Sequence, residues 1–104
     1  MAELATLVAA MEEKAAQLET LGYRVRFDLT DGGTILLDAA DGQTTIHEAE
    51  GSAEADTILK LSSDNLAKLL AGRLSPMLAF STGRLKLQGS QGVALKLLRL
   101  LNVD

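Results

Sequence analysis

Apolar residues recur at helical spacing along the first 21 residues of the chain. Positions 4, 7, 8, 11, 15, 18 and 21 are apolar and share one face, whereas the charged residues at 12–14 lie largely opposite. Because an α-helix completes a turn in 3.6 residues, this periodicity predicts one amphipathic helix over residues 4–21. Gly22 ends it, since glycine adopts the left-handed conformation after a helix at the lowest cost.

Alternating polar and apolar residues then predict strands with one wet and one buried face. Asp31-Gly32-Gly33 is a hairpin turn between the first two strands, and Asp41-Gly42 is a second turn that leads into a third, edge strand. Residues 50–54 form a small-residue crossover loop. The expected strands in this part of the chain are 23–29, 34–38, 44–48 and 56–61.

Helical and strand patterns alternate in the remaining residues. Ser62 or Ser63 caps a helix that runs to Ala71, and Ser75-Pro76 starts a short apolar helix that Gly83 ends. Residues 84–88 alternate as a half-buried fifth strand should, and Gly89-Ser90 opens a last helix.

The last helix carries more apolar surface than one sheet face can cover. At 100° per residue, its apolar positions from Val93 onward fill an arc of roughly 160°, against about 100° for a surface helix. Leu98 lies at the edge of this arc and Leu95 lies outside it. We therefore expect a further element, a ligand or a partner to cover this helix.

Composition limits the classes of partner. The 104 residues suit one domain, 1–104, with a single core. The net charge of −4 and ten Lys and Arg that we expect to be scattered disfavour nucleic acid and lasting attachment to anionic membranes. With no cysteine, no signal-peptide pattern and no apolar run long enough to span a bilayer, we expect a cytoplasmic protein without stable membrane insertion.

Residues able to perform chemistry are few and isolated, so the sequence predicts no catalytic residue, no metal site and no cofactor. His47 is the single histidine and lies on the expected edge strand, where a solvated side chain is the favoured interpretation. The serines lie where caps and turns need them, and the aspartates flank hairpin turns. Residues 89–92 precede a helix and could cradle a head-group phosphate, although a plain turn with a cap is the stronger interpretation.

The apolar content is aliphatic, with 21 leucines and only three aromatic residues. On composition alone, an ordinary aliphatic core is favoured over a ligand cavity. Met77 favours a cavity slightly, because methionine adapts to variable apolar partners.

Several spaced segments between about Asp56 and Leu98 form a recognisable set. The segments are Ala55-Asp56-Thr57, Leu61-Ser62-Ser63-Asp64, Leu69-Leu70-Ala71-Gly72-Arg73-Leu74-Ser75-Pro76, Ala79-Phe80, Gly83-Arg84-Leu85-Lys86-Leu87 and Gly92-Val93-Ala94-Leu95-Lys96-Leu97. Together they resemble the sterol carrier protein type 2 family. Before Asp56 the resemblance extends only to the order of elements.

The resemblance implies an α+β fold with a five-stranded mixed sheet in the order 3-2-1-4-5. Strands 1 and 4 would be parallel, the helices would pack on one face, and an apolar tunnel between them would hold lipids, fatty acyl chains or sterols. The chain departs from several relatives at Thr82, where they have glutamine at the tunnel mouth. The lipid-binding residues expected on this basis are Phe27, Leu69, Leu74, Met77, Phe80, Thr82, Leu85, Val93, Leu97, Leu100 and Leu101.

The function expected from this resemblance is non-enzymatic binding and carriage of a lipid or another long apolar molecule. The alternative is a protein interaction or accessory module that docks through its apolar last helix, on a second copy of the chain or on an enzyme.

Overall fold

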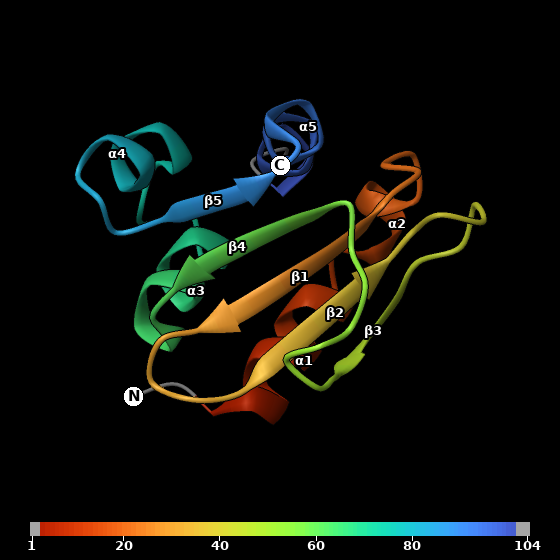
Figure 1. The fold of residues 1–104 in the computed structure, drawn as a ribbon, viewed down its shortest axis with the longest axis horizontal. Coiled ribbons are helices and arrows are strands. Elements are labelled where there is room, and N and C mark those ends of the chain that lie inside the picture. Colours follow the sequence, from red (N-terminus) through yellow and green to blue (C-terminus); the bar gives the residue numbers. More distant parts are fainter. Residues whose placement is uncertain (1–2, 102–104) are drawn as a thin grey trace.

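The computed structural model describes residues 3–101 and contains one mixed sheet with its helices on one face (Figure 1). In chain order the elements are α1 (Leu4–Glu12), α2 (Ala15–Leu18), β1 (Arg24–Leu29), β2 (Thr34–Asp38), β3 (Thr45–Glu48), β4 (Thr57–Leu61), α3 (Ser63–Leu70), α4 (Pro76–Ser81), β5 (Lys86–Gly89) and α5 (Gln91–Leu101).

The five strands lie in the order β3-β2-β1-β4-β5, with β1 and β4 parallel and the other neighbours antiparallel. This confirms the predicted topology. Phe27 lies at the centre of the sheet, opposite Ile35 on one side and Leu59 on the other. All three are buried, because alternate residues of each strand face the helices.

The helices divide the covered face between them. At one end of the sheet α1 packs against β3 and α3, and at the other end α5 packs against β4 and β5. α4 lies near β5, at the end of the sheet opposite to α1 (Figure 1). The sheet thus has one end under α1 and another end under α4 and α5.

The predicted continuous helix over residues 4–21 is wrong, because the chain breaks at Glu13 and Lys14 into α1 and α2. The Lys14 N–H donates to Met11 O at 2.9 Å, a three-residue bond that replaces the helical four-residue one. After this turn α2 packs against α5, whereas α1 stays against α3. Part of the wide apolar arc of α5 is therefore covered by α2 of the same chain.

The fifth strand begins two residues later than the sequence predicts. The N–H groups of Arg84 and Leu85 both donate to Ala79 O, at 2.9 and 3.0 Å, so they bond α4 instead of β4. Pairing with β4 starts at Lys86 and ends at Gly89. Gly89 has φ +99°, and a Cβ there would stand 2.9 Å from Asp56 O, so the approach of these two strands requires glycine.

The predicted helix caps are present. Ser62 Oγ accepts a hydrogen bond from the Asn65 N–H at 3.1 Å, and Ser75 Oγ accepts one from the Leu78 N–H at 3.5 Å. Ser62, and not Ser63, is thus the N-cap of α3. Ser63 instead donates both its N–H and its hydroxyl to the carboxylate of Asp31, which ties the β1–β2 turn to the start of α3.

Candidate functional site

α4 carries three of the five large apolar side chains that are exposed among residues 3–101. Of its six residues only Ala79 is buried, whereas Met77, Leu78 and Phe80 are 69%, 51% and 49% exposed. A helix of six residues has too few internal hydrogen bonds to be stable alone, so its attachment must come from elsewhere. Ala79 provides it, because its side chain enters the core and its carbonyl accepts two N–H groups from the residues that follow α4.

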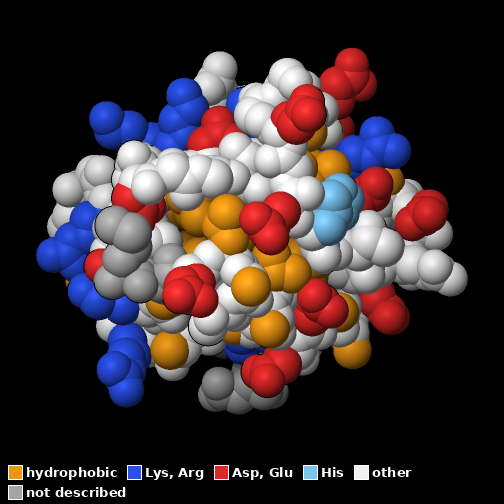
Figure 2. Space-filling view, turned by 90° about the horizontal axis from the view of Figure 1, so that it is seen from below, with side chains coloured by type: hydrophobic (Ala, Val, Ile, Leu, Met, Phe, Trp, Pro, Cys, Tyr) orange, Lys and Arg blue, Asp and Glu red, His pale blue; other side chains and the backbone are white. Residues whose placement is uncertain are grey.

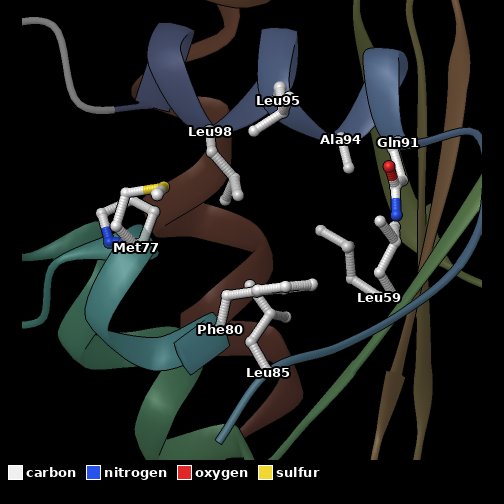
Figure 3. Close-up of a pocket in the computed structure, with 10 residues that line it drawn as sticks. Leu59, Met77, Phe80, Leu85, Gln91, Ala94, Leu95 and Leu98 are labelled. Atoms are coloured by element: carbon white, nitrogen blue, oxygen red, sulfur yellow. The ribbon is translucent and has the colours of Figure 1, made fainter. Parts of the chain in front are cut away.

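A cavity of about 200 Å³ lies between α4, β5 and α5. Figure 3 shows Phe80 pointing from α4 into this space, with Leu85 beside it. Leu98 and Ala94 project toward the same space from α5. The lining residues are Leu59, Pro76, Met77, Phe80, Leu85, Leu87, Gln91, Ala94, Leu95 and Leu98.

Two surface hollows adjoin the cavity and share lining residues with it. One hollow, of about 420 Å³, shares Phe80 and Leu87 with the cavity and extends to Lys86 and Gly83. The other, of about 310 Å³, shares Met77 and extends to Ser75 and Arg99. Each hollow thus shares apolar residues with the cavity and is also lined by one basic side chain, Lys86 or Arg99.

The electrostatics of the cavity are simple. None of its lining residues is ionisable, and Gln91 supplies the polar atoms among them. The carboxyl groups whose pKa values are lowered lie outside it: hydrogen bonds from Ser63 lower the pKa of Asp31, and a hydrogen bond from the Ala40 N–H lowers that of Asp38. Such a cavity can hold an apolar molecule but offers no group for acid, base or nucleophilic chemistry.

The structure places only some of the predicted lipid-binding residues at the cavity. Met77, Phe80 and Leu85 line the cavity. Thr82 caps the end of α4 by donating its hydroxyl to Leu78 O at 2.7 Å, and Leu100 is partly buried against the core. The other predicted residues are buried in the core and do not line this cavity: Phe27, Leu69, Leu74, Val93, Leu97 and Leu101.

Other lining residues were not foreseen from the sequence. On α5 they are Gln91, Ala94, Leu95 and Leu98, whose spacing places them on one face of the helix. The position of Leu95 in the sequence could have indicated this lining, because Leu95 falls outside the apolar arc that packs on the sheet; in the structure it is 48% exposed. Leu98, expected at the edge of the arc and within reach of a partner, is instead 9% exposed and lines the cavity.

No described contact supports phosphate binding at residues 89–92 or catalysis at His47. Ser90 Oγ accepts from the Val93 N–H at 3.3 Å and caps α5, which matches the plain-turn interpretation of residues 89–92. His47 is exposed on β3. Within residues 3–101, no three His, Asp or Glu side chains gather as metal ligands, and no helix in that range is long and apolar enough to cross a membrane.

Residues 4–102 match the SCP-2 sterol transfer family. The chain belongs to this family. Among curated proteins it is 36% identical over 80 residues to the bovine (Bos taurus) hydroxysteroid dehydrogenase-like protein 2, a match that covers 77% of this chain and 19% of the relative. The chain thus spans about a fifth of the length of that relative.

Solved structures share the fold of this family member. The solution structure of the sterol carrier protein domain 2 of Helicoverpa armigera aligns with a TM-score of 0.72 and 25% identity, over 96% of this chain and 87% of that chain. The structure of a UbiJ-SCP2 ubiquinone synthesis protein aligns with a TM-score of 0.66 and 19% identity, over 98% of this chain and 93% of that one. The second likeness shows the fold alone.

Proposed function

We propose that the chain binds the apolar part of a lipid between α4, β5 and α5 and carries it without performing chemistry on it. The observation that supports this most directly is the apolar cavity, which has no ionisable lining residue and adjoins two surface hollows. Membership of a sterol transfer family supports the same ligand class. We propose a cytoplasmic location for this carrier.

The cavity has room for part of an acyl chain. Its volume of about 200 Å³ is below the usual range of ligand pockets, roughly 300–1,000 Å³. A whole lipid would therefore extend into the adjoining hollows or displace α4 outward. Such a displacement would remove only one residue of α4, Ala79, from a buried position.

The expected affinity follows from the length of chain that is buried. Each buried methylene contributes about 0.8 kcal/mol, so ten contribute at most about 8 kcal/mol. Association costs several kcal/mol of this, which leaves a micromolar or somewhat weaker dissociation constant. Selectivity among chain lengths is expected to be low, because one methylene changes the affinity little.

Two exposed leucines provide a matched test. Leu95 lines the cavity and Leu78 does not, although both are helical and about half exposed. With a fluorescent fatty acid in solution, we expect Leu95→Gln to weaken binding several-fold and Leu78→Gln to leave it unchanged. Equal effects of the two substitutions, or no saturable binding by the folded wild type, would contradict the proposal.

A second candidate is an accessory module that presents its ligand to an enzyme. It is supported by the bovine relative, in which the matched segment forms about a fifth of a longer chain. Docking of a partner on the apolar face of α5 is less well supported, because Leu97, Leu98 and Leu101 are already buried within the domain. Native mass spectrometry of freshly purified protein would distinguish a lipid carrier from a module that docks on a protein, since bound lipid and a second protein chain have different masses.

A further inference from the structure

The net charge of −4 conceals two halves of opposite sign. Thirteen of the fourteen Asp and Glu residues lie within residues 1–64, which contain only four Lys and Arg. Residues 65–101 contain six Lys and Arg and no acidic residue. The expectation that the basic residues are scattered is therefore wrong. Figure 2, which views the α1, β2 and β3 side of the molecule, shows acidic side chains around a group of hydrophobic ones, with basic side chains toward the edges.

The first of two charged surfaces is basic and surrounds α4. Arg73 and Arg84 are exposed shortly before and shortly after this helix. Lys86 and Arg99 each line one of the two hollows that adjoin the cavity. We call this region the basic surface. It consists of the exposed apolar residues Met77, Leu78, Phe80 and Leu95, with the basic residues Arg73, Arg84, Lys86 and Arg99 around them.

The second charged surface is acidic and lies on α1 and β3, at the end of the sheet opposite to α4 (Figure 1). Glu48 shares one side of β3 with the buried Ile46, because alternate residues of a strand point to the same face, and this is the side that α1 covers. On α1 itself two small apolar residues, Ala5 and Ala9, are exposed. We call this region the acidic surface. Its exposed acidic residues are Glu3, Glu12, Glu48 and Glu50.

Neither surface neutralises its charges within the chain. Elsewhere the chain does form ion pairs, because Arg24 bonds Asp38 at 3.0 Å and Arg26 bonds Asp28 at 2.9 Å. Among residues 3–101, in contrast, no ion pair joins a basic side chain of the basic surface or a carboxylate of the acidic surface to another residue. Both surfaces therefore present free charge of opposite sign to other molecules.

We propose that the basic surface of one copy of this chain binds the acidic surface of a second copy, head to tail. Opposite charges attract the two copies and orient them as they meet. The exposed apolar residues of α4 then lie against Ala5 and Ala9, whose small side chains leave room for larger ones. A symmetric contact of α4 with α4 is disfavoured, because two basic surfaces repel each other.

This contact has a consequence for the cavity. Residues of the basic surface line both adjoining hollows, so a second copy seated on that surface covers them and slows the exchange of a ligand. That consequence rests on the proposed function, whereas the contact itself depends only on charges and exposed residues. Because the two surfaces lie at opposite ends of the sheet, each copy can use both, and association continues beyond a dimer.

Sedimentation equilibrium of the protein without added ligand measures the contact over a series of protein concentrations. At low salt the average mass of wild type should rise with concentration and exceed that of a dimer. At high salt it should return to that of the monomer, because exposed charges are screened. A wild type that stays monomeric at low salt, or that associates equally well at high salt, would overturn the proposal.

Charge reversals locate the two surfaces. Arg84→Glu and Glu48→Lys should each raise the dissociation constant roughly fivefold, because an attraction between exposed charges becomes a repulsion. Glu48→Lys reduces the net charge from −4 to −2, so relief of general repulsion between copies would have the opposite effect. If Glu48→Lys associates as wild type does while Arg84→Glu does not, the basic surface binds its own counterpart in the second copy and the proposal is wrong.

Lys14→Glu is the matched control for Arg84→Glu, because both substitutions change the net charge from −4 to −6. Lys14 directly follows the acidic end of α1, so its reversal should leave association unchanged or strengthen it. Equal weakening by both substitutions would mean that net charge controls association, which contradicts the proposal.

Mixing the two variants tests the head-to-tail geometry. Arg84→Glu keeps the acidic surface and Glu48→Lys keeps the basic one, so an equimolar mixture retains an intact contact between unlike chains. The mixture should associate with about the dissociation constant of wild type, and this recovery would also show that both variants fold. No gain on mixing of two variants that circular dichroism shows to be folded would overturn the proposal.

Uptake of a fluorescent fatty acid at low salt separates this proposal from the proposed function. As the protein concentration rises, uptake should slow for wild type but not for Glu48→Lys, whose substitution lies far from both hollows. Equal rates where wild type associates would show that the contact leaves the hollows open. If wild type associates but never binds the probe, the contact stands and lipid binding is wrong. If it binds the probe but stays monomeric, lipid binding stands and the contact is wrong.

Discussion

The two phenylalanines of this chain lie in two regions that use apolar residues differently: the filled end, strands β1 to β3 with α1, and the cavity end, β5 with α4 and α5. Phe27, on the central strand β1, is 1% exposed between Ile35 and Leu59. Phe80, on α4, is 49% exposed and points into a cavity. The first end is filled, because β1 and β2 each have a strand on both sides and helices above. The second end borders the edge strand β5, so its apolar residues have fewer partners and leave an open space.

The same contrast extends to charge and to attachment. Residues 1–64 carry thirteen of the fourteen acidic residues, whereas residues 65–101, which include α4, β5 and α5, carry six basic residues and none that is acidic. At the filled end, Asp31 ties a turn to the start of α3. At the cavity end, α4 is attached through Ala79. An apolar residue can therefore serve as core or as lining, and the number of elements that cover it decides which.

Alanine in place of each phenylalanine should give the largest difference between the two ends. Phe27→Ala should cost about 3–5 kcal/mol of unfolding free energy, because it opens a cavity in a filled core. Phe80→Ala should cost less than about 1 kcal/mol, because its ring is half exposed. Denaturant unfolding measures both. Similar losses would show that the cavity end is packed like the core.

Two glycines test how firmly β5 and α5 are attached. Gly89→Ala should destabilise the protein by about 1–3 kcal/mol, because it places a Cβ 2.9 Å from Asp56 O at a positive φ. Gly92→Ala should stabilise it by up to about 1 kcal/mol, because a Cβ added to this helical glycine would lie 3.9 Å from Ser90 Oγ, an ordinary contact distance. Thermal unfolding measures both shifts, and a Gly89→Ala variant as stable as wild type would contradict the described pairing of β4 with β5.

Acid should weaken the filled end through Asp31. The hydrogen bonds from Ser63 lower the pKa of this carboxyl in the folded protein below its ordinary value of 3.8. The carboxylate therefore contributes stability above pH 3.8, and that contribution is lost as the pH falls through the lower folded-state pKa. We expect Asp31→Asn to be less stable than wild type at neutral pH and the difference to shrink in acid. A difference that stays constant with pH would show that the charge has no role.

The smallest effect on stability is expected at the mouth of the cavity. Met77→Arg should change the unfolding free energy by no more than about 0.5 kcal/mol, because Met77 is 69% exposed. Fatty-acid binding should nevertheless fall, since the substitution brings a charge to an apolar lining position. Circular dichroism and probe fluorescence on the same sample distinguish loss of the fold from loss of fatty-acid binding. Global unfolding would mean that α4 is packed more tightly than its exposure indicates.

Much of the fold was predictable from residues close together in the sequence. Alternation placed the strands, and Ser62, Ser75 and Ser90 each cap the helix that follows. The order of the strands followed from the resemblance to a known family, not from periodicity. The break at Lys14 was not predicted, because the apolar spacing continues through it. The turn is needed only because α2 packs against α5 while α1 packs against α3.

The candidate site was predictable only in part. The sequence identified α4 and found Met77, Phe80 and Leu85, but it also included six residues that the structure buries in the core. Leu97 and Leu98 are neighbours of the same type and both are buried in the core, yet only Leu98 also lines the cavity. The sequence by itself determined which residues are apolar and which half of the chain is basic. Only the tertiary structure decided which leucines border an open space, because that depends on how many elements, distant in the sequence, converge around each side chain.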